Sequence, residues 1–180
     1  MGEHPRAAVS GLRRFGLLSA VDALLGLLAL ALFLAAAGTL LYATVLSIDQ
    51  VLTPTEDGMA RHDSVLALLT ALGWASGGAG LVMLLVDLPV LVLSVPRSRT
   101  GHPSRLTAIL SLVAVGAGSF LPLALIALVW AAWTFQAEAV LFLLALMLAA
   151  VLLAIVPLVR LAQLVSGVLD LVRRRSADTG

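Results

Sequence analysis

The chain has 180 residues, of which 61% are hydrophobic and only 12% are charged, and its formal net charge is +1. A soluble domain is about one quarter charged, so this composition excludes an ordinary soluble protein and indicates a polytopic membrane protein. There are no cysteines, which excludes disulfides and thiolate chemistry. All basic residues are arginine. That usage is typical of a GC-rich bacterial genome, and we expect a bacterial inner-membrane protein.

The first apolar segment predicts a membrane span over about residues 16–47. It exceeds the ~20 residues that a bilayer requires, so we expect it to tilt or to project at one end. It is also longer than the apolar core of a signal peptide, about 7–15 residues, which favours an uncleaved helix. An acidic outer loop is expected at 48–63, because Pro54 and Gly58 interrupt the segment there.

The second span is expected at about 64–95 and contains one acid, Asp87, and no base. Residues spaced by three and four positions back from Asp87 share one helix face, and several of them are small. Small side chains let helices approach closely inside a bilayer. We therefore expect a set of small residues in the second and third spans to serve helix packing: Gly73, Ser76, Gly80, Gly116 and Gly118.

The third and fourth spans are expected at about 105–135 and 138–173, joined by a tight turn. A basic cytoplasmic loop, 96–105, precedes them. The fourth segment continues beyond Arg160 with polar residues on one face, which predicts an amphipathic cytoplasmic extension. The sequence thus predicts an all-α fold, a single four-helix transmembrane bundle occupying residues 1–180.

The arginines predict the orientation of this bundle. Three lie near the N-terminus, three in the middle loop and three in the C-terminal tail, whereas the acidic loop has only Arg61. Because positive residues remain cytoplasmic, both termini are expected inside. Arginines at that face are expected to contact anionic lipids: Arg13, Arg14, Arg97, Arg99, Arg105, Arg173, Arg174 and Arg175.

Three charges interrupt the apolar spans. Asp87 and Arg160 each follow apolar stretches of similar length counted from the outer side, and Asp22 lies slightly nearer the cytoplasm. An isolated charge inside a bilayer costs ~2.5–3.5 kcal/mol on insertion scales. We therefore expect an Asp87–Arg160 ion pair with Asp22 as a second acceptor. This network either fixes helix register or forms an ion relay, in which Asp22 is the better candidate for a titrating group.

The sequence contains no HExxH, phosphate-loop or GxSxG motif. His62 and Asp63 are a weak candidate for a metal or acid–base pair. We therefore expect no enzyme, no cofactor or metal site and no nucleic-acid partner. The leading hypothesis is an accessory or scaffold subunit of a membrane assembly, or a homo-oligomer. The alternatives are a small transporter or channel that uses Asp22, Asp87 and Arg160, and a holin-like permeabilising protein.

Overall fold

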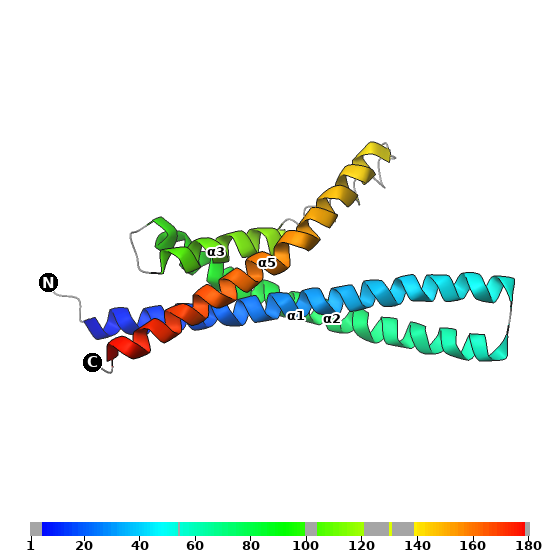
Figure 1. Cartoon of the computed structure of the whole chain (residues 1–180), viewed down its shortest axis with the longest axis horizontal. Helices are drawn as coiled ribbons and strands as arrows, with labels where there is room; N and C mark the ends of the chain where they lie inside the picture. The colour runs from blue at the N-terminus through cyan, green and yellow to red at the C-terminus, as the bar shows by residue number, and fades with distance from the viewer. Residues whose placement is uncertain (1–4, 54, 100–103, 121–129, 131–138, 179–180) are drawn as a thin grey trace. The chain divides into compact units, whose positions relative to one another are not determined.

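The computed structural model describes residues 5–53, 55–99, 104–120, 130 and 139–178, and within these ranges it shows helices and no strand. Figure 1 shows the elements in chain order. They are α1 (Pro5–Leu52), α2 (Glu56–Arg99), α3 (Arg105–Val115), the π-helix η1 (Gly116–Phe120) and α5 (Ala139–Asp178). The predicted all-helical class is therefore confirmed for the described residues.

Three of these helices are long and apolar enough to cross a membrane. The candidate spans are Arg14–Leu52, Glu56–Arg99 and Ala150–Val172. The third expected span, 105–135, is represented by the shorter apolar helix Arg105–Ser119, because most of its second half lies outside the described residues. The tight turn expected at Gln136 also lies outside them.

The connection between α1 and α2 differs from the expected loop at 48–63. α1 continues to Leu52 and α2 already begins at Glu56. The side chain of Thr55 accepts a hydrogen bond from the backbone N–H of Gly58 at 3.1 Å, which caps the start of α2. Two acids, Glu56 and Asp57, occupy the first turn, where the helix dipole favours negative charge. The polar residues of this region therefore extend both helices instead of interrupting them.

The basic segment expected as a loop at 96–105 is also partly helical. α2 continues through Pro96 to Arg99, and α3 begins at Arg105. Arg97 and Arg99 lie in the last turn of α2, where positive charge is favoured by the helix dipole. The fourth expected span, 138–173, corresponds to α5, which continues to Asp178.

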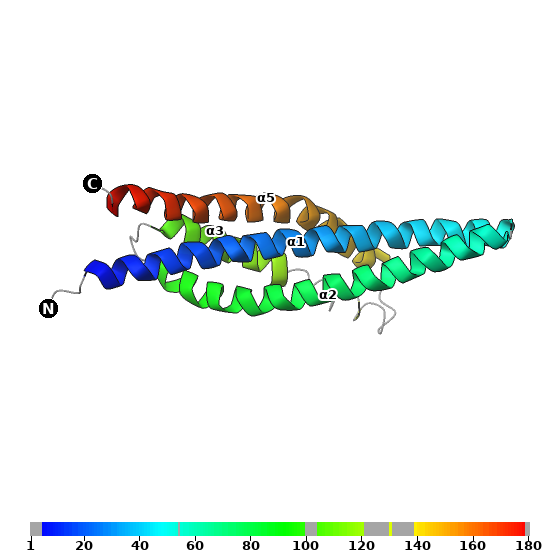
Figure 2. The ribbon, with the colours of Figure 1, turned by 90° about the horizontal axis from the view of Figure 1, so that it is seen from below.

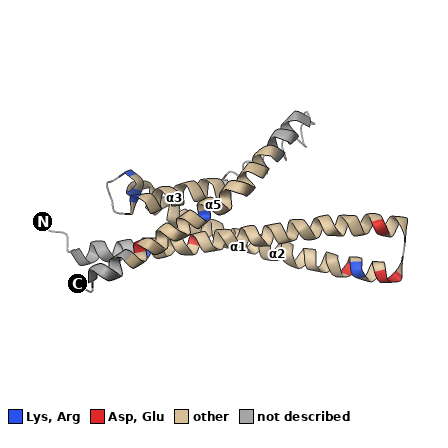
Figure 3. Ribbon diagram, viewed as in Figure 1, with Lys and Arg blue, Asp and Glu red and all other residues tan. Residues whose placement is uncertain are grey.

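The chain divides into two compact units. Unit 1 comprises residues 1–27 and 84–180, and unit 2 comprises residues 28–83. In unit 2, α1 and α2 form an antiparallel pair that both Figure 1 and Figure 2 show side by side. Figure 3 shows acidic residues gathered near the turn of this pair. Unit 1 contains the polar network described next.

Candidate functional site: a buried charge network

Arg160 of α5 is fully buried in unit 1 and contacts acids from two other helices. Its Nη1 lies 2.7 Å from Oδ2 of Asp22 on α1, and its Nη2 lies 3.2 Å from Oδ1 of Asp87 on α2. The side chains of Arg160 and Asp22 are fully buried, and that of Asp87 is 4% exposed. One guanidinium therefore holds two carboxyl groups from two other helices. The structure brings together the three charged residues that the sequence analysis grouped.

Gln163 lies one turn beyond Arg160 and continues the network. Its Nε2 donates to Oδ2 of Asp22 at 2.8 Å and lies within 3.4 Å of the Ser19 hydroxyl and 3.3 Å of the Ser111 hydroxyl. Its Oε1 accepts a hydrogen bond from Arg160 at 3.3 Å. Gln163 thus bonds α1 and α3 to α5 at the level of the charges.

Three serines complete the network from other elements. The hydroxyls of Ser19 and Ser111 lie 2.9 Å apart and join α1 to α3. Ser119, in η1, donates to Oδ2 of Asp87 and joins the π-helix to α2. All three serines are buried. Polar groups buried in this way require partners, and these hydroxyls find them across helices rather than within one.

Glycines make room for the arginine. A Cβ placed on Gly26 would lie 2.6 Å from Arg160 Nε, and a Cβ placed on Gly118 would lie 2.8 Å from Arg160 Nη2. Gly118 belongs to η1, and a π-turn within a helical segment is frequently a functional feature. Gly16 and Gly167 allow a second close approach, because a Cβ on Gly167 would lie 3.1 Å from the Gly16 carbonyl oxygen.

The charges of the network do not balance. Two carboxyl groups face one guanidinium, and Gln163 and the serines add no charge. Within the described part of the chain, Asp22 Oδ1 and Arg160 Nε are buried without a hydrogen-bond partner. A net charge without compensation is costly in a dry interior. The network can therefore hold one additional positive charge.

A second polar contact lies further along α5. The Thr107 hydroxyl donates to Oδ2 of Asp170 at 2.6 Å and joins α3 to α5. The polar face expected on the fourth segment beyond Arg160 thus contacts other helices through Gln163, Gly167 and Asp170.

The small residues predicted for helix packing differ in their surroundings. Gly118 contacts Arg160, whereas a Cβ at Gly73, Gly80 or Gly116 would meet nothing within 4 Å among the described residues. Ser76 is half-buried. The faces at Gly73 and Gly80 therefore have space for another helix.

Among the arginines predicted to contact lipid, Arg14, Arg99 and Arg105 are exposed. Arg97 is half-buried: its Nη1 donates to the Leu93 carbonyl at 2.8 Å, and its guanidinium lies 4.6 Å from the centre of the Phe15 ring. The side chains of Arg13, Arg173, Arg174 and Arg175 lie outside the description.

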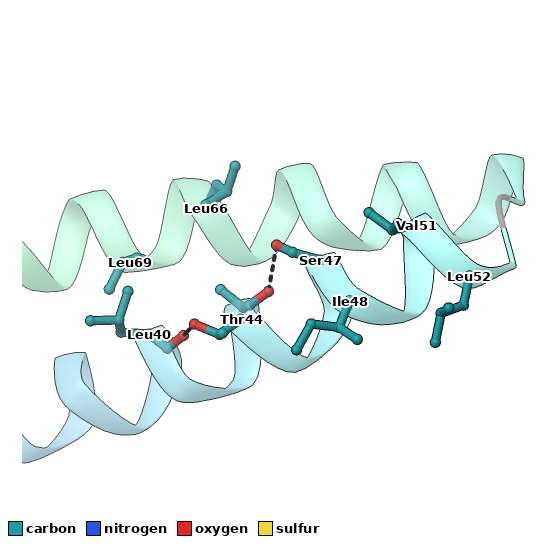
Figure 4. A pocket seen from close by; sticks show the side chains of 9 residues that line it. Leu40, Thr44, Ser47, Ile48, Val51, Leu52, Leu66 and Leu69 are labelled. Atoms are coloured by element: carbon teal, nitrogen blue, oxygen red, sulfur yellow. Dashed lines mark hydrogen bonds between the residues drawn. The ribbon is translucent and has the colours of Figure 1, made fainter.

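Unit 2 holds an open apolar groove of about 450 Å³ between α1 and α2, shown in Figure 4. Its two hydroxyl residues, Thr44 and Ser47, donate to carbonyls of their own helix, so the groove is apolar in character. His62 lies 2.9 Å from the Ser47 hydroxyl and 4.0 Å from Asp63, whose side chain is 85% exposed. No group of three or more His, Cys, Asp or Glu side chains suitable for a metal occurs among the residues that the structure describes.

Sequence reasoning did not assign Ser19, Ser111 or Gly26 to the network. The signal available was the spacing of Ser19, Asp22 and Gly26, which are three and four positions apart on one helix face.

Comparison with protein-family models, with curated proteins and with solved structures finds no match for this chain.

Proposed function

We propose that the chain is a multi-pass integral membrane protein of the bacterial inner membrane, with both termini in the cytoplasm. We further propose that it is a non-enzymatic accessory or scaffold subunit of a larger membrane assembly or a homo-oligomer. The observation that carries this proposal is the surface of the long helices. In their most apolar windows only 6%, 17% and 33% of the residues are buried within the chain. Such a surface is favourable against lipid or against other membrane helices, and unfavourable against water.

Unit 2 supports the subunit role most directly. Apolar side chains such as Leu41, Leu68 and Trp74 are exposed along its two helices, and Trp74 is 79% exposed. The same region carries Gly73 and Gly80, where an added Cβ would meet nothing within 4 Å among the described residues. Partner helices can approach closely at such positions.

The orientation is tested by reporter fusions after Pro54 and after Gly180. We expect a periplasmic signal after Pro54, beside the acidic end of unit 2, and a cytoplasmic signal after Gly180. A cytoplasmic signal after Pro54 would refute the orientation.

The subunit role is tested by purification in mild detergent and measurement of the mass of the particle. Gly73→Leu and Gly80→Leu add bulk to the proposed contact face, and Ala75→Leu adds comparable bulk to the opposite face. We expect the two glycine variants to release a partner or a second copy and Ala75→Leu to retain it. A wild-type particle that contains a single chain and detergent alone would overturn the proposal.

A small transporter or channel is the second candidate, favoured by the buried charges of Asp22, Asp87 and Arg160. Ionisable residues within spanning segments often mark ion pathways. Flux driven by a pH gradient in liposomes that contain the purified chain alone would support this candidate over the subunit role.

A further inference from the structure

We propose that the network in unit 1 is a binding site for a single proton, held on Oδ1 of Asp22. This inference goes beyond a scaffold role, and it names the ion that the transporter candidate would use. The inference depends on the proposed membrane location in one respect, because water must stay out of the interior of unit 1.

Each described helix that faces the site contributes a known set of charges. α1 contributes Asp22, α2 contributes Asp87 and α5 contributes Arg160. From α3 and η1 the network receives only the hydroxyls of Ser111 and Ser119. Asp170 is the next acid along α5 after Arg160, and its carboxyl group accepts a hydrogen bond from Thr107. Fully ionised, the network therefore carries one surplus negative charge.

That surplus charge has a high free-energy cost. The three side chains are 0–4% exposed, so water does not screen them. Buried ionisable groups under these conditions neutralise instead of remaining charged. One bound proton makes the network neutral, because it leaves one carboxylate opposite one guanidinium.

The hydrogen bonds of the two carboxyl groups locate the proton. Asp22 Oδ2 accepts hydrogen bonds from Arg160 and Gln163. Asp87 Oδ1 accepts one from Arg160, and Asp87 Oδ2 accepts one from Ser119. Asp22 Oδ1 alone has no donor within the described part of the chain. The other three carboxyl oxygens already accept a hydrogen bond. A proton on Asp22 Oδ1 therefore does not compete with a hydrogen-bond donor.

Binding is an acid–base step without other chemistry. A proton adds to Asp22 Oδ1 to form the O–H bond of a carboxylic acid, and release returns the carboxylate and the free proton. Asp87 keeps its hydrogen bonds from Arg160 and Ser119 in both states. Release restores the surplus charge, so it requires water or a second cation to reach the network.

Infrared spectroscopy of the full-length protein in detergent and in liposomes tests the proposal. At neutral pH, wild-type protein is expected to show the C=O stretching band of a protonated carboxylic acid, which shifts in D₂O and on ¹³C-aspartate labelling. Asp22→Asn should lose the band. The control Asp49→Asn, at an exposed carboxylate in unit 2, should retain it.

If Asp22→Asn does not fold, the wild type labelled with ¹³C-aspartate still tests the proposal, because the shift of its band identifies a protonated aspartate. Asp87→Asn provides a second check, because it removes the surplus charge and should abolish the band while Asp22 pairs with Arg160. No band in wild type at neutral pH, or a band that persists in Asp22→Asn, would overturn the proposal. Loss of the band on adding sodium chloride, but not choline chloride, at constant pH would assign the site to a sodium ion instead.

Discussion

The Arg160 guanidinium donates a hydrogen bond to Oδ2 of Asp22 at 2.7 Å, both side chains are fully buried, and they come from the last and the first helices of the described chain. Residues 138 positions apart in sequence are thereby joined by a charge-assisted hydrogen bond. With Asp87 on α2, this pair connects three helices of unit 1.

Asn and Leu at position 22 should differ in their effect on stability. An amide resembles a protonated carboxyl group and can still accept hydrogen bonds from Arg160 and Gln163, so Asp22→Asn should change the free energy of unfolding by less than about 1 kcal/mol. Asp22→Leu leaves those donors without an acceptor and should cost about 1–3 kcal/mol. Thermal unfolding in detergent measures both. Equal effects of the two substitutions would contradict this role of Asp22.

The glycines beside Arg160 should not tolerate a methyl group. Gly26→Ala and Gly118→Ala place Cβ within 2.6 and 2.8 Å of the guanidinium, which forces Arg160 to shift. Overpacking of this kind typically costs about 1–3 kcal/mol. Gly73→Ala and Gly80→Ala are the controls, because their Cβ would meet nothing within 4 Å among the described residues. Unfolding midpoints that fall as far in the controls would count against the steric argument.

The crossing of α1 and α5 at Gly16 and Gly167 should be similarly sensitive. A Cβ on Gly167 would lie 3.1 Å from the Gly16 carbonyl oxygen and 3.3 Å from the Ala20 nitrogen, both backbone atoms that cannot rotate away. We expect Gly167→Ala to lower the unfolding midpoint, and Gly167→Leu to lower it further. A disulfide between cysteines introduced at Ser19 and Ser111 reports on the adjacent α1–α3 contact and should still form in the Gly167→Ala variant. Unchanged midpoints in both Gly167 variants would show that the helices can separate here without cost.

The contact of Thr107 with Asp170 should stabilise the α3–α5 pair. Thr107→Val retains the shape of the side chain but removes the donor at 2.6 Å, and hydrogen bonds to charged groups contribute about 1.5–3 kcal/mol. Thr70→Val is the control, since the exposed Thr70 hydroxyl donates to the carbonyl of Leu66 on its own helix. A loss in the Thr107 variant no larger than in the control would show that the hydrogen bond contributes little.

The charged part of the network could be predicted from the sequence because charges within apolar helices need partners. Asp22, Asp87 and Arg160 lie within the apolar parts of the predicted spans, so they had few partners except one another. The other charges of these spans lie at their ends or in the amphipathic extension: Arg105, Glu138, Asp170 and Arg173. The ends of the helices were harder to predict. Acids and arginine are compatible with a helix, and polar residues near Glu56 therefore extend α2 where a loop was expected.

The serines could not be assigned from the sequence for a different reason. Thr39, Thr44 and Ser64 bond to the carbonyl four residues back in their own helix. Ser19 and Ser111 use the same kind of hydroxyl to bond across helices. Nothing in the local sequence separates these two uses, because the choice depends on which helix packs alongside.

The central claim is that buried, paired charges hold the helices of unit 1 together, and a double-mutant cycle in detergent tests it most directly. Arg160→Leu leaves a buried carboxylate unpaired and should cost about 3–5 kcal/mol. The double variant Asp87→Leu with Arg160→Leu removes both charges of the pair and should recover most of that loss. An Arg160→Leu protein as stable as wild type, or a double variant no more stable than Arg160→Leu alone, would contradict the account.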